Sequence, residues 1–148
     1  LWAVLYGGAF GERATSEEGP LQVGASLYRG QGCSGCHGPT GGGGVGPALD
    51  GSVKTFPAFE DQISWIRTGS APFKGQPYGA TGKIATGGMP GFPDLTDEEV
   101  IAIVCHERVA YAEEELPAQC EAGASPDAGE GGETGEAESS TDSASAES

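Results

Sequence analysis

The chain has 148 residues, the length of one ordinary domain, and 27 of them are glycine, well above the usual share of about 7%. Only 36% of the residues are hydrophobic and the formal net charge is −15, so side chains alone are too few to build a large dry core. The 22 acidic residues outnumber 7 basic ones, which argues against nucleic acid as a partner, because phosphate binding relies on clustered Lys and Arg.

Residues 1–19 begin with the uncharged stretch LWAVLYGGAFG and continue as a polar linker. This stretch is shorter than the roughly 20 apolar residues that cross a bilayer. Because the first residue is Leu1 rather than Met, we expect a fragment or a mature product. Two interpretations stay open, the end of a truncated membrane anchor and a plain hydrophobic arm, since Trp2 and Tyr6 suit either one.

Residues 20–120 predict one domain with short helices. A helical pattern of apolar residues starts at Leu21 and runs into glycine after Tyr28. A second helix is expected near residues 59–68, where Gly69 follows as a stop.

A third helix is marked by a capping box, with Thr96 as the N-cap and Glu99 three residues later. Leu95 and Val100 flank this box as a hydrophobic staple, and an apolar stripe then continues along the helix.

Two long stretches, residues 38–56 and 69–93, have no sustained helical or strand period and contain many Gly and Pro residues. They are predicted to be long loops. Loops of this length are uncommon in a small domain unless they wrap a functional centre.

Residues 33–37, CSGCH, have the C-x-x-C-H pattern of covalent haem attachment. The thiols of Cys33 and Cys36 can add to two vinyl groups of one porphyrin, and His37 can then bind the iron. Two other interpretations are weaker. A thioredoxin-like dithiol needs a surrounding strand-helix-strand pattern, which the sequence lacks, and a zinc site needs a second ligand pair in knuckle spacing.

Met89 is the chain's one methionine, and it lies in the segment GGMPG, 52 residues beyond His37. A loop of this length can pass around the ring edge and present the thioether sulfur to the other face of the haem. A soft thioether suits ferrous iron and raises the reduction potential relative to two nitrogen ligands. The alternative role of Met89 is simple core packing.

With these motifs the chain resembles the class I (His/Met) c-type cytochromes, particularly the small bacterial ones. The resemblance covers roughly residues 24–109. It is carried by CSGCHG at 33–38, GGGVGPAL at 42–49, ISWIRTG at 63–69 and MPGF at 89–92.

The resemblance implies a mainly α cytochrome c fold, with three to five short helices and Gly-rich loops around one covalently attached haem c. It also implies that the Pro47 carbonyl accepts a hydrogen bond from His37, and that the first and last helices cross tightly at a small residue, for which Gly24 is the candidate. A large apolar porphyrin would then replace the missing core side chains, and glycine would allow close approach of the backbone.

The remaining site residues are expectations of the same kind. Trp65, and less directly Arg67, would donate to a haem propionate; for Trp65 a plain core role stays open. We expect a dry haem pocket, lined by residues such as Leu49, Phe56, Ile63, Trp65, Ile66, Ile84, Phe92 and Val100.

The last helix departs from the family, because CHER at 105–108 replaces a stretch that usually contains an aromatic residue. We interpret His106 as a partly exposed structural histidine rather than an axial ligand. The resemblance implies an extracytoplasmic, oxidising compartment, where Cys105 and Cys120 would pair and stabilise the fold by about 3 kcal/mol. A buried free Cys105 remains the alternative.

The function implied is one-electron transfer by a carrier outside the cytoplasm, without substrate chemistry. Two alternatives stay open: a haem c subunit permanently docked on a dehydrogenase or oxidase, and a catalytic or ligand-binding haem domain such as a peroxidase or gas sensor.

Residues 121–148 contain eight acids and no Lys or Arg, so we expect a disordered acidic tail. The acid excess predicts redox partners with a positive docking patch.

Overall fold

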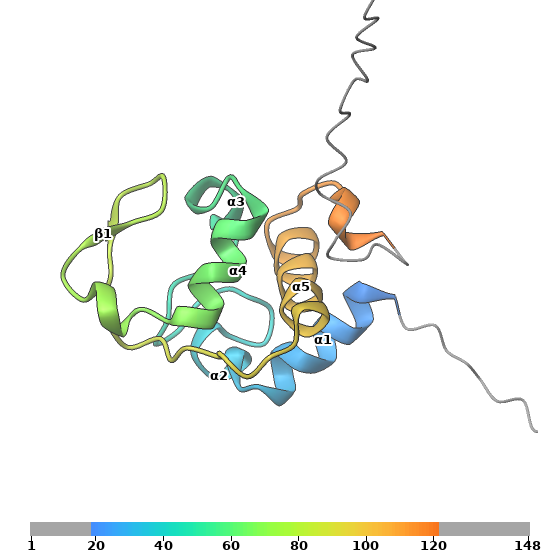
Figure 1. The fold of residues 1–148 in the computed structure, drawn as a ribbon, viewed down its shortest axis with the longest axis horizontal. Helices are drawn as coiled ribbons and strands as arrows, with labels where there is room; N and C mark the ends of the chain where they lie inside the picture. The colour runs from blue at the N-terminus through green and yellow to red at the C-terminus, as the bar shows by residue number, and fades with distance from the viewer. Residues whose placement is uncertain (1–18, 122–148) are drawn as a thin grey trace, which may run out of the picture.

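A computed structural model describes residues 19–121 of the protein (Figure 1). The expected N-terminal arm and acidic tail lie outside the described residues, apart from Gly19 and Glu121. Within the described residues, five α-helices and one small hairpin make up most of the regular structure. They are α1 (Pro20–Gly30), α2 (Cys33–His37), α3 (Ser52–Thr55), α4 (Phe59–Thr68), β1 (Pro77–Tyr78), β2 (Lys83–Ile84) and α5 (Asp97–His106). The mainly α fold with short helices that the sequence predicts is confirmed.

Helices α1 and α5 cross at the side of the domain away from the hairpin (Figure 1). At the crossing, a β-carbon added to Gly24 would lie 1.9 Å from the carbonyl oxygen of Ala102 and 2.8 Å from Cβ of His106. No side chain fits in this space. The tight crossing at Gly24 that the resemblance implies is therefore present.

Helix α5 begins as its sequence predicts. Thr96 Oγ1 accepts a hydrogen bond from the Glu99 backbone N–H (3.2 Å), and the Thr96 N–H donates to Glu99 Oε2 (2.9 Å). The flanking Leu95 and Val100 are both buried in the core. Reciprocal capping and the staple together fix where the helix starts and which face it turns inward.

The core lies between α4 and α5 and extends to the C-terminal segment. A disulfide joins Cys105 of α5 to Cys120 in the short 3₁₀ turn η3 (Ala118–Cys120), and both residues are buried. This bond holds the chain after α5 against that helix. The buried cluster consists of Phe59, Ile66, Leu95, Val100, Ile103, Val104, Cys105 and Cys120.

The two expected loops contain short regular elements that the sequence did not predict. Helix α3 lies within residues 38–56, and the β1–β2 hairpin lies within residues 69–93, together with the 3₁₀ turn η1 (Ala71–Phe73). Each is too short to display a hydrophobic period, so the prediction of wholly irregular loops was wrong. In the part of the chain that the structure describes, no helix is long and apolar enough to cross a membrane.

Candidate functional site

One cavity of about 270 Å³ brings the predicted site residues together. The C-x-x-C-H segment forms part of its wall and the Met89 loop another part, although the two are far apart in the sequence. The six residues predicted to bind a cofactor all line this cavity: Cys33, Cys36, His37, Pro47, Trp65 and Met89.

His37, the last residue of α2, is buried, and its orientation is fixed by the chain that follows. Its Nδ1 donates a hydrogen bond to the carbonyl oxygen of Pro47 (2.8 Å). Because a carbonyl can only accept, Nδ1 carries a proton, and Nε2 is the ring nitrogen left to bind a metal. Gly46 allows this approach, since a β-carbon there would lie 3.1 Å from two atoms of the imidazole.

Cys33 and Cys36 lie on the short helix α2 as free, half-buried thiols. Burial, and secondarily the charge of Glu107, raises the pKa of Cys33 to about 11. A redox-active dithiol is usually marked by a lowered thiol pKa, so Cys33 does not match that class of site. The pair is suited instead to a group that bonds to both sulfurs at the cavity wall.

Met89 is held by hydrogen bonds that fix its backbone against the end of α4. Its N–H donates to Ser70 Oγ (2.9 Å), and its carbonyl accepts from the Ser70 N–H (3.0 Å). Gly69 and Gly91 bring the two segments together, because a β-carbon on Gly69 would lie 2.4 Å from the Gly91 nitrogen. Sequence reasoning missed Ser70, whose type and spacing give no signal of this contact.

The apolar part of the cavity wall matches the expectation only in part. Trp65 lies on the wall with its ring stacked on Tyr78, at a centroid distance of 4.3 Å. Ile63 and Val100 were wrongly expected on the wall; Ile63 packs against the core cluster and Val100 is fully buried within it. The expected residues that do line the cavity are Leu49, Phe56, Trp65, Ile66, Ile84 and Phe92.

Arg67 also departs from the expectation. Its guanidinium donates to the carbonyl oxygen of Leu95 (2.9 Å) and forms an ion pair with Asp97. Both partners belong to the start of α5, and Arg67 is not among the residues that line the cavity. Its expected role as a propionate donor was therefore wrong, and it links α4 to the N-terminus of α5 instead.

His106 lies outside the cavity lining, at the crossing of α1 and α5. Its Nε2 is hydrogen-bonded to the hydroxyl of Tyr111 (2.9 Å), and its ring packs against Tyr28. Burial, with a smaller contribution from Arg29, lowers its pKa, so the ring stays neutral at physiological pH. These contacts give His106 a packing role.

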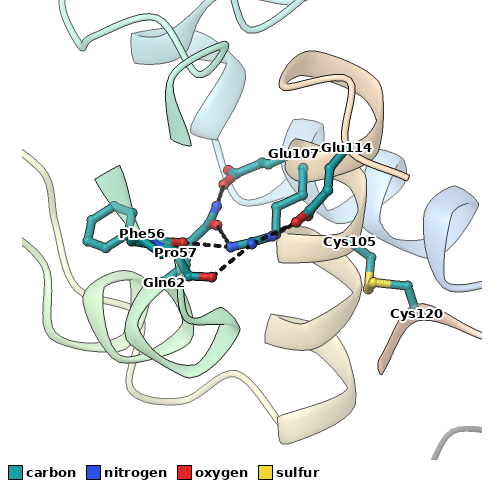
Figure 2. A network of polar contacts seen from close by, with 8 residues as sticks. Phe56, Pro57, Gln62, Cys105, Glu107, Glu114 and Cys120 are labelled. Carbon is teal, nitrogen blue, oxygen red and sulfur yellow. Dashed lines mark hydrogen bonds and ion pairs between the residues drawn. A yellow bond between two sulfur atoms is a disulfide. The ribbon is translucent and has the colours of Figure 1, made fainter. Parts of the chain in front are cut away.

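Figure 2 shows a polar network that sequence reasoning did not foresee. Gln62 connects Glu107 to Arg108, the first two residues of η2 (Glu107–Tyr111), and Arg108 is paired with Glu114. Gln62 and Glu107 themselves line the cavity. The spacing held a signal, because Glu107 and Arg108 lie four residues after Ile103 and Val104 and so continue the buried face of α5.

The residues around the cavity fit a haem. Two thiols, an imidazole whose Nδ1 is bonded to a carbonyl and a thioether line one largely apolar cavity. Ser52 also lines the cavity, and its Oγ is buried without a hydrogen-bond partner among the described residues. A buried hydroxyl normally has a partner, so the orphaned oxygen agrees with a bound group that carries polar atoms.

Comparison with known proteins agrees with this geometry. Residues 21–106 match the family model described as Cytochrome c. No curated protein and no solved structure matches the chain. The matched residues make up more than half of the chain and contain the C-x-x-C-H segment and Met89. The chain therefore belongs to the cytochrome c family, whose membership implies covalently bound haem c and haem-based electron transfer.

Proposed function

We propose that this chain is a carrier of single electrons, with one haem c attached through thioethers to Cys33 and Cys36. His37 Nε2 and Met89 Sδ would hold its iron. The observation that carries this proposal is the common cavity, which is lined both by an imidazole with its Nδ1 already bonded to Pro47 and by a backbone-anchored methionine.

The haem, when bound, supplies an iron that accepts and returns one electron. The chain's own residues adapt it for transfer. The Pro47 carbonyl keeps the His37 ring in one orientation and makes its free nitrogen a better donor. The thioether of Met89 favours the ferrous state and so raises the reduction potential.

Rigid ligand positions support a carrier rather than a catalyst. Met89 is anchored by its N–H and its carbonyl to Ser70, which is only 3% exposed. A backbone held in this way would keep the thioether in place in both oxidation states, and this supports a closed site without an open position for a small molecule. The wall is largely apolar, and with a haem in the cavity it would limit the rearrangement of water that accompanies each electron.

Trp65 remains the proposed donor to a haem propionate. Its position on the cavity wall supports this role, as does the stacking on Tyr78 that restricts its ring. Replacing Trp65 with Phe keeps an aromatic ring and removes the donor. A lowered reduction potential with an intact spectrum would agree with the role, and an unchanged potential would assign Trp65 to packing alone.

The ligand set is tested by the absorption spectrum of the full chain, matured with haem-attachment machinery. The oxidised protein should show the weak far-red band of methionine bound to ferric iron, and Met89→Leu should abolish it. His106→Gln, at the chain's other histidine, should keep the band. A high-spin or five-coordinate native protein would instead favour a peroxidase or a gas sensor.

Stable attachment to an enzyme is the second alternative, in which this domain is a subunit of a dehydrogenase or an oxidase. A stoichiometric partner that co-purifies with the native protein would favour it. A single chain that exchanges electrons with a purified oxidase would favour the free carrier.

We place the protein outside the cytoplasm, in the periplasm or on the outer face of the cytoplasmic membrane, with a tether through the N-terminal segment as one possibility. The buried disulfide between Cys105 and Cys120 supports an oxidising compartment. Labelling of intact cells with a membrane-impermeant reagent tests this location.

The net charge of −15 supports partners that present a positive patch, although Lys83 on the cavity wall is a local exception. Small redox reagents of opposite charge test this proposal. A cationic ruthenium ammine should exchange electrons faster than anionic ferricyanide, and added salt should reduce the difference. The opposite order of rates would show that the local charge at the cavity dominates.

A further inference from the structure

Glu107 is a buried carboxylate on the wall of the cavity. Only 6% of the residue is exposed, although it carries an ionisable group. Buried carboxylates are uncommon because a charge loses its hydration inside a protein, and they are usually paired with a cation. The groups around Glu107 therefore decide whether its carboxylate is paired with a cation.

The polar contact of Glu107 is with a neutral amide. Gln62 Nε2 donates to Glu107 Oε2 (2.9 Å), and Gln62 Oε1 accepts from Arg108 (3.2 Å). The contact with Arg108 fixes the Gln62 amide, so that its NH₂ group faces Glu107 (Figure 2). Gln62 thus separates the carboxylate from the nearest guanidinium.

The charge of Arg108 is already neutralised by another acid. Its guanidinium bonds both carboxylate oxygens of Glu114, at 2.6 and 3.0 Å, and also donates to the carbonyls of Phe56 and Pro57. Within residues 19–121 no salt bridge includes Glu107. Its carboxylate is therefore buried with one neutral donor and without a paired cation.

Of the titratable groups in this part of the molecule, Glu107 is the one that the structure favours as a proton-binding group around neutral pH. Tyr28 from α1 and Tyr111 from η2 both have raised pKa values, chiefly because of burial, and stay protonated. Cys33 from α2 would cease to titrate on forming a thioether. Of the remaining charged groups, Arg67 of α4 is paired with Asp97, and His106 is kept neutral by burial. The others on the elements and the cavity wall around Glu107 are exposed: Arg29, Lys54, Glu60, Asp61 and Lys83.

Given the electron-carrier function proposed above, we infer that Glu107 is a proton-binding site coupled to electron transfer. As one electron from the redox partner enters the cavity, the Glu107 carboxylate takes up one proton from solvent and forms an O–H bond. On oxidation that bond breaks and the proton returns to solvent. One electron and one proton thus enter and leave together, and no other reactant is needed.

Electrostatics gives the direction of this coupling. Burial raises the pKa of Glu107 from the ordinary 4.5 to about 7, so the group is near its midpoint at neutral pH. An added electron makes the cavity more negative and favours the neutral acid. Linkage then requires that an ionised Glu107 favours the oxidised protein, so the reduction potential falls as pH rises through this range.

The reduction potential of the holoprotein, measured between pH 5 and pH 9, tests the inference. In the wild type the potential should fall most steeply near neutral pH. The slope is bounded by one proton per electron, a tenfold change in the equilibrium per pH unit or about 59 mV. Glu107→Gln keeps the size and an acceptor for Gln62, and it should flatten this region and raise the potential at pH 8.

A matched control is Glu115→Gln, which removes one equally negative but exposed carboxylate and should keep the wild-type profile. A second measurement needs no variant. Reduction of the wild type at pH 7 in weak buffer should take up protons, seen with an indicator dye, and infrared difference spectra should gain a protonated carboxyl band.

Each outcome decides a different claim. A pH-independent wild-type potential without proton uptake would overturn the inference while leaving the electron carrier intact. Unchanged pH dependence in Glu107→Gln, with the far-red band retained, would assign the proton to another group and also overturn it. A protein that shows no reversible one-electron couple would instead contradict the proposed function itself.

Discussion

The backbone of Met89 is bonded to Ser70 in both directions: the Met89 N–H donates to Ser70 Oγ at 2.9 Å, and the Ser70 N–H donates to the Met89 carbonyl at 3.0 Å. The pair joins the loop that carries the proposed sixth ligand to the end of α4. Ser70 is 3% exposed, so water cannot replace its hydroxyl without rearrangement. The hydroxyl therefore acts as a positioning group for Met89.

Ser70→Ala should loosen this ligand. An unpaired buried N–H costs about 1–3 kcal/mol, so added imidazole should displace Met89 from ferric iron at least about fivefold more readily than in the wild type. Optical titration measures the apparent dissociation constant. Ser64→Ala, an exposed position on α4, is the control. Equal dissociation constants in all three proteins would show that Ser70 does not position Met89.

Gly24→Ala should destabilise the fold. The new β-carbon would lie 1.9 Å from the Ala102 carbonyl, so α1 and α5 must separate. Overpacking of this kind costs about 1–3 kcal/mol in the free energy of unfolding, measured by urea titration. Gly30→Ala is the matched control, because nothing lies within 4 Å of its β-carbon and the change favours the helix. Equal losses in the two variants would contradict the tight crossing.

Replacing both Cys105 and Cys120 with Ala should lower the free energy of unfolding by about 3 kcal/mol, because the bond closes a loop with a sequence separation of 15. Chemical reduction of the wild type should reproduce this loss, since thioethers to Cys33 and Cys36 resist thiol reagents. The haem spectrum should persist at low denaturant. A reductant-insensitive unfolding midpoint would contradict a stabilising role for the disulfide.

Stability should also depend on pH through Glu107. Burial raises its pKa from 4.5 to about 7, so the folded protein holds this proton more tightly than the unfolded chain. The resulting stabilisation is complete below the pKa of the unfolded chain and is lost as pH rises through about 7. The free energy of unfolding of Glu107→Gln, minus that of the wild type, should therefore be larger at pH 8 than at pH 5 by up to about 3 kcal/mol.

Denaturant unfolding at the two pH values measures this difference directly. For Glu115→Gln the stability difference from the wild type should be nearly the same at both pH values, because that carboxylate is exposed. If the stability difference between Glu107→Gln and the wild type were the same at pH 5 and pH 8, the raised pKa would be contradicted.

Much of the fold was predictable because local signals coincided with it. The capping box at Thr96 and Glu99 fixed the start of α5, and the apolar spacing before Gly69 located α4. The short α3 and the hairpin were missed, since their stability comes from loop contacts rather than from periodicity. An example is the bond from the Gly75 N–H to the Ala85 carbonyl (2.8 Å).

The candidate site divides along similar lines. Cys33, Cys36 and His37 lie within five consecutive residues, so their spacing alone indicates covalent haem attachment. The contact of Ser70 with Met89 joins segments far apart in the chain, which no local pattern encodes. The spacing of α5 could have shown that Glu107 is buried, but not that Gln62 is its partner. The role expected for Arg67 failed for the same reason, because Asp97, 30 residues later, provides its partner.

The central claim is that Met89 is the sixth ligand in a closed, low-spin haem site. It is tested most directly by the far-red absorption of the oxidised full-length protein, recorded for the wild type and for Met89→Leu, which conserves volume and removes the sulfur. The account predicts a methionine-to-iron band in the wild type and its loss in the variant. A band that survives in Met89→Leu, or a wild type that lacks it, would contradict the account.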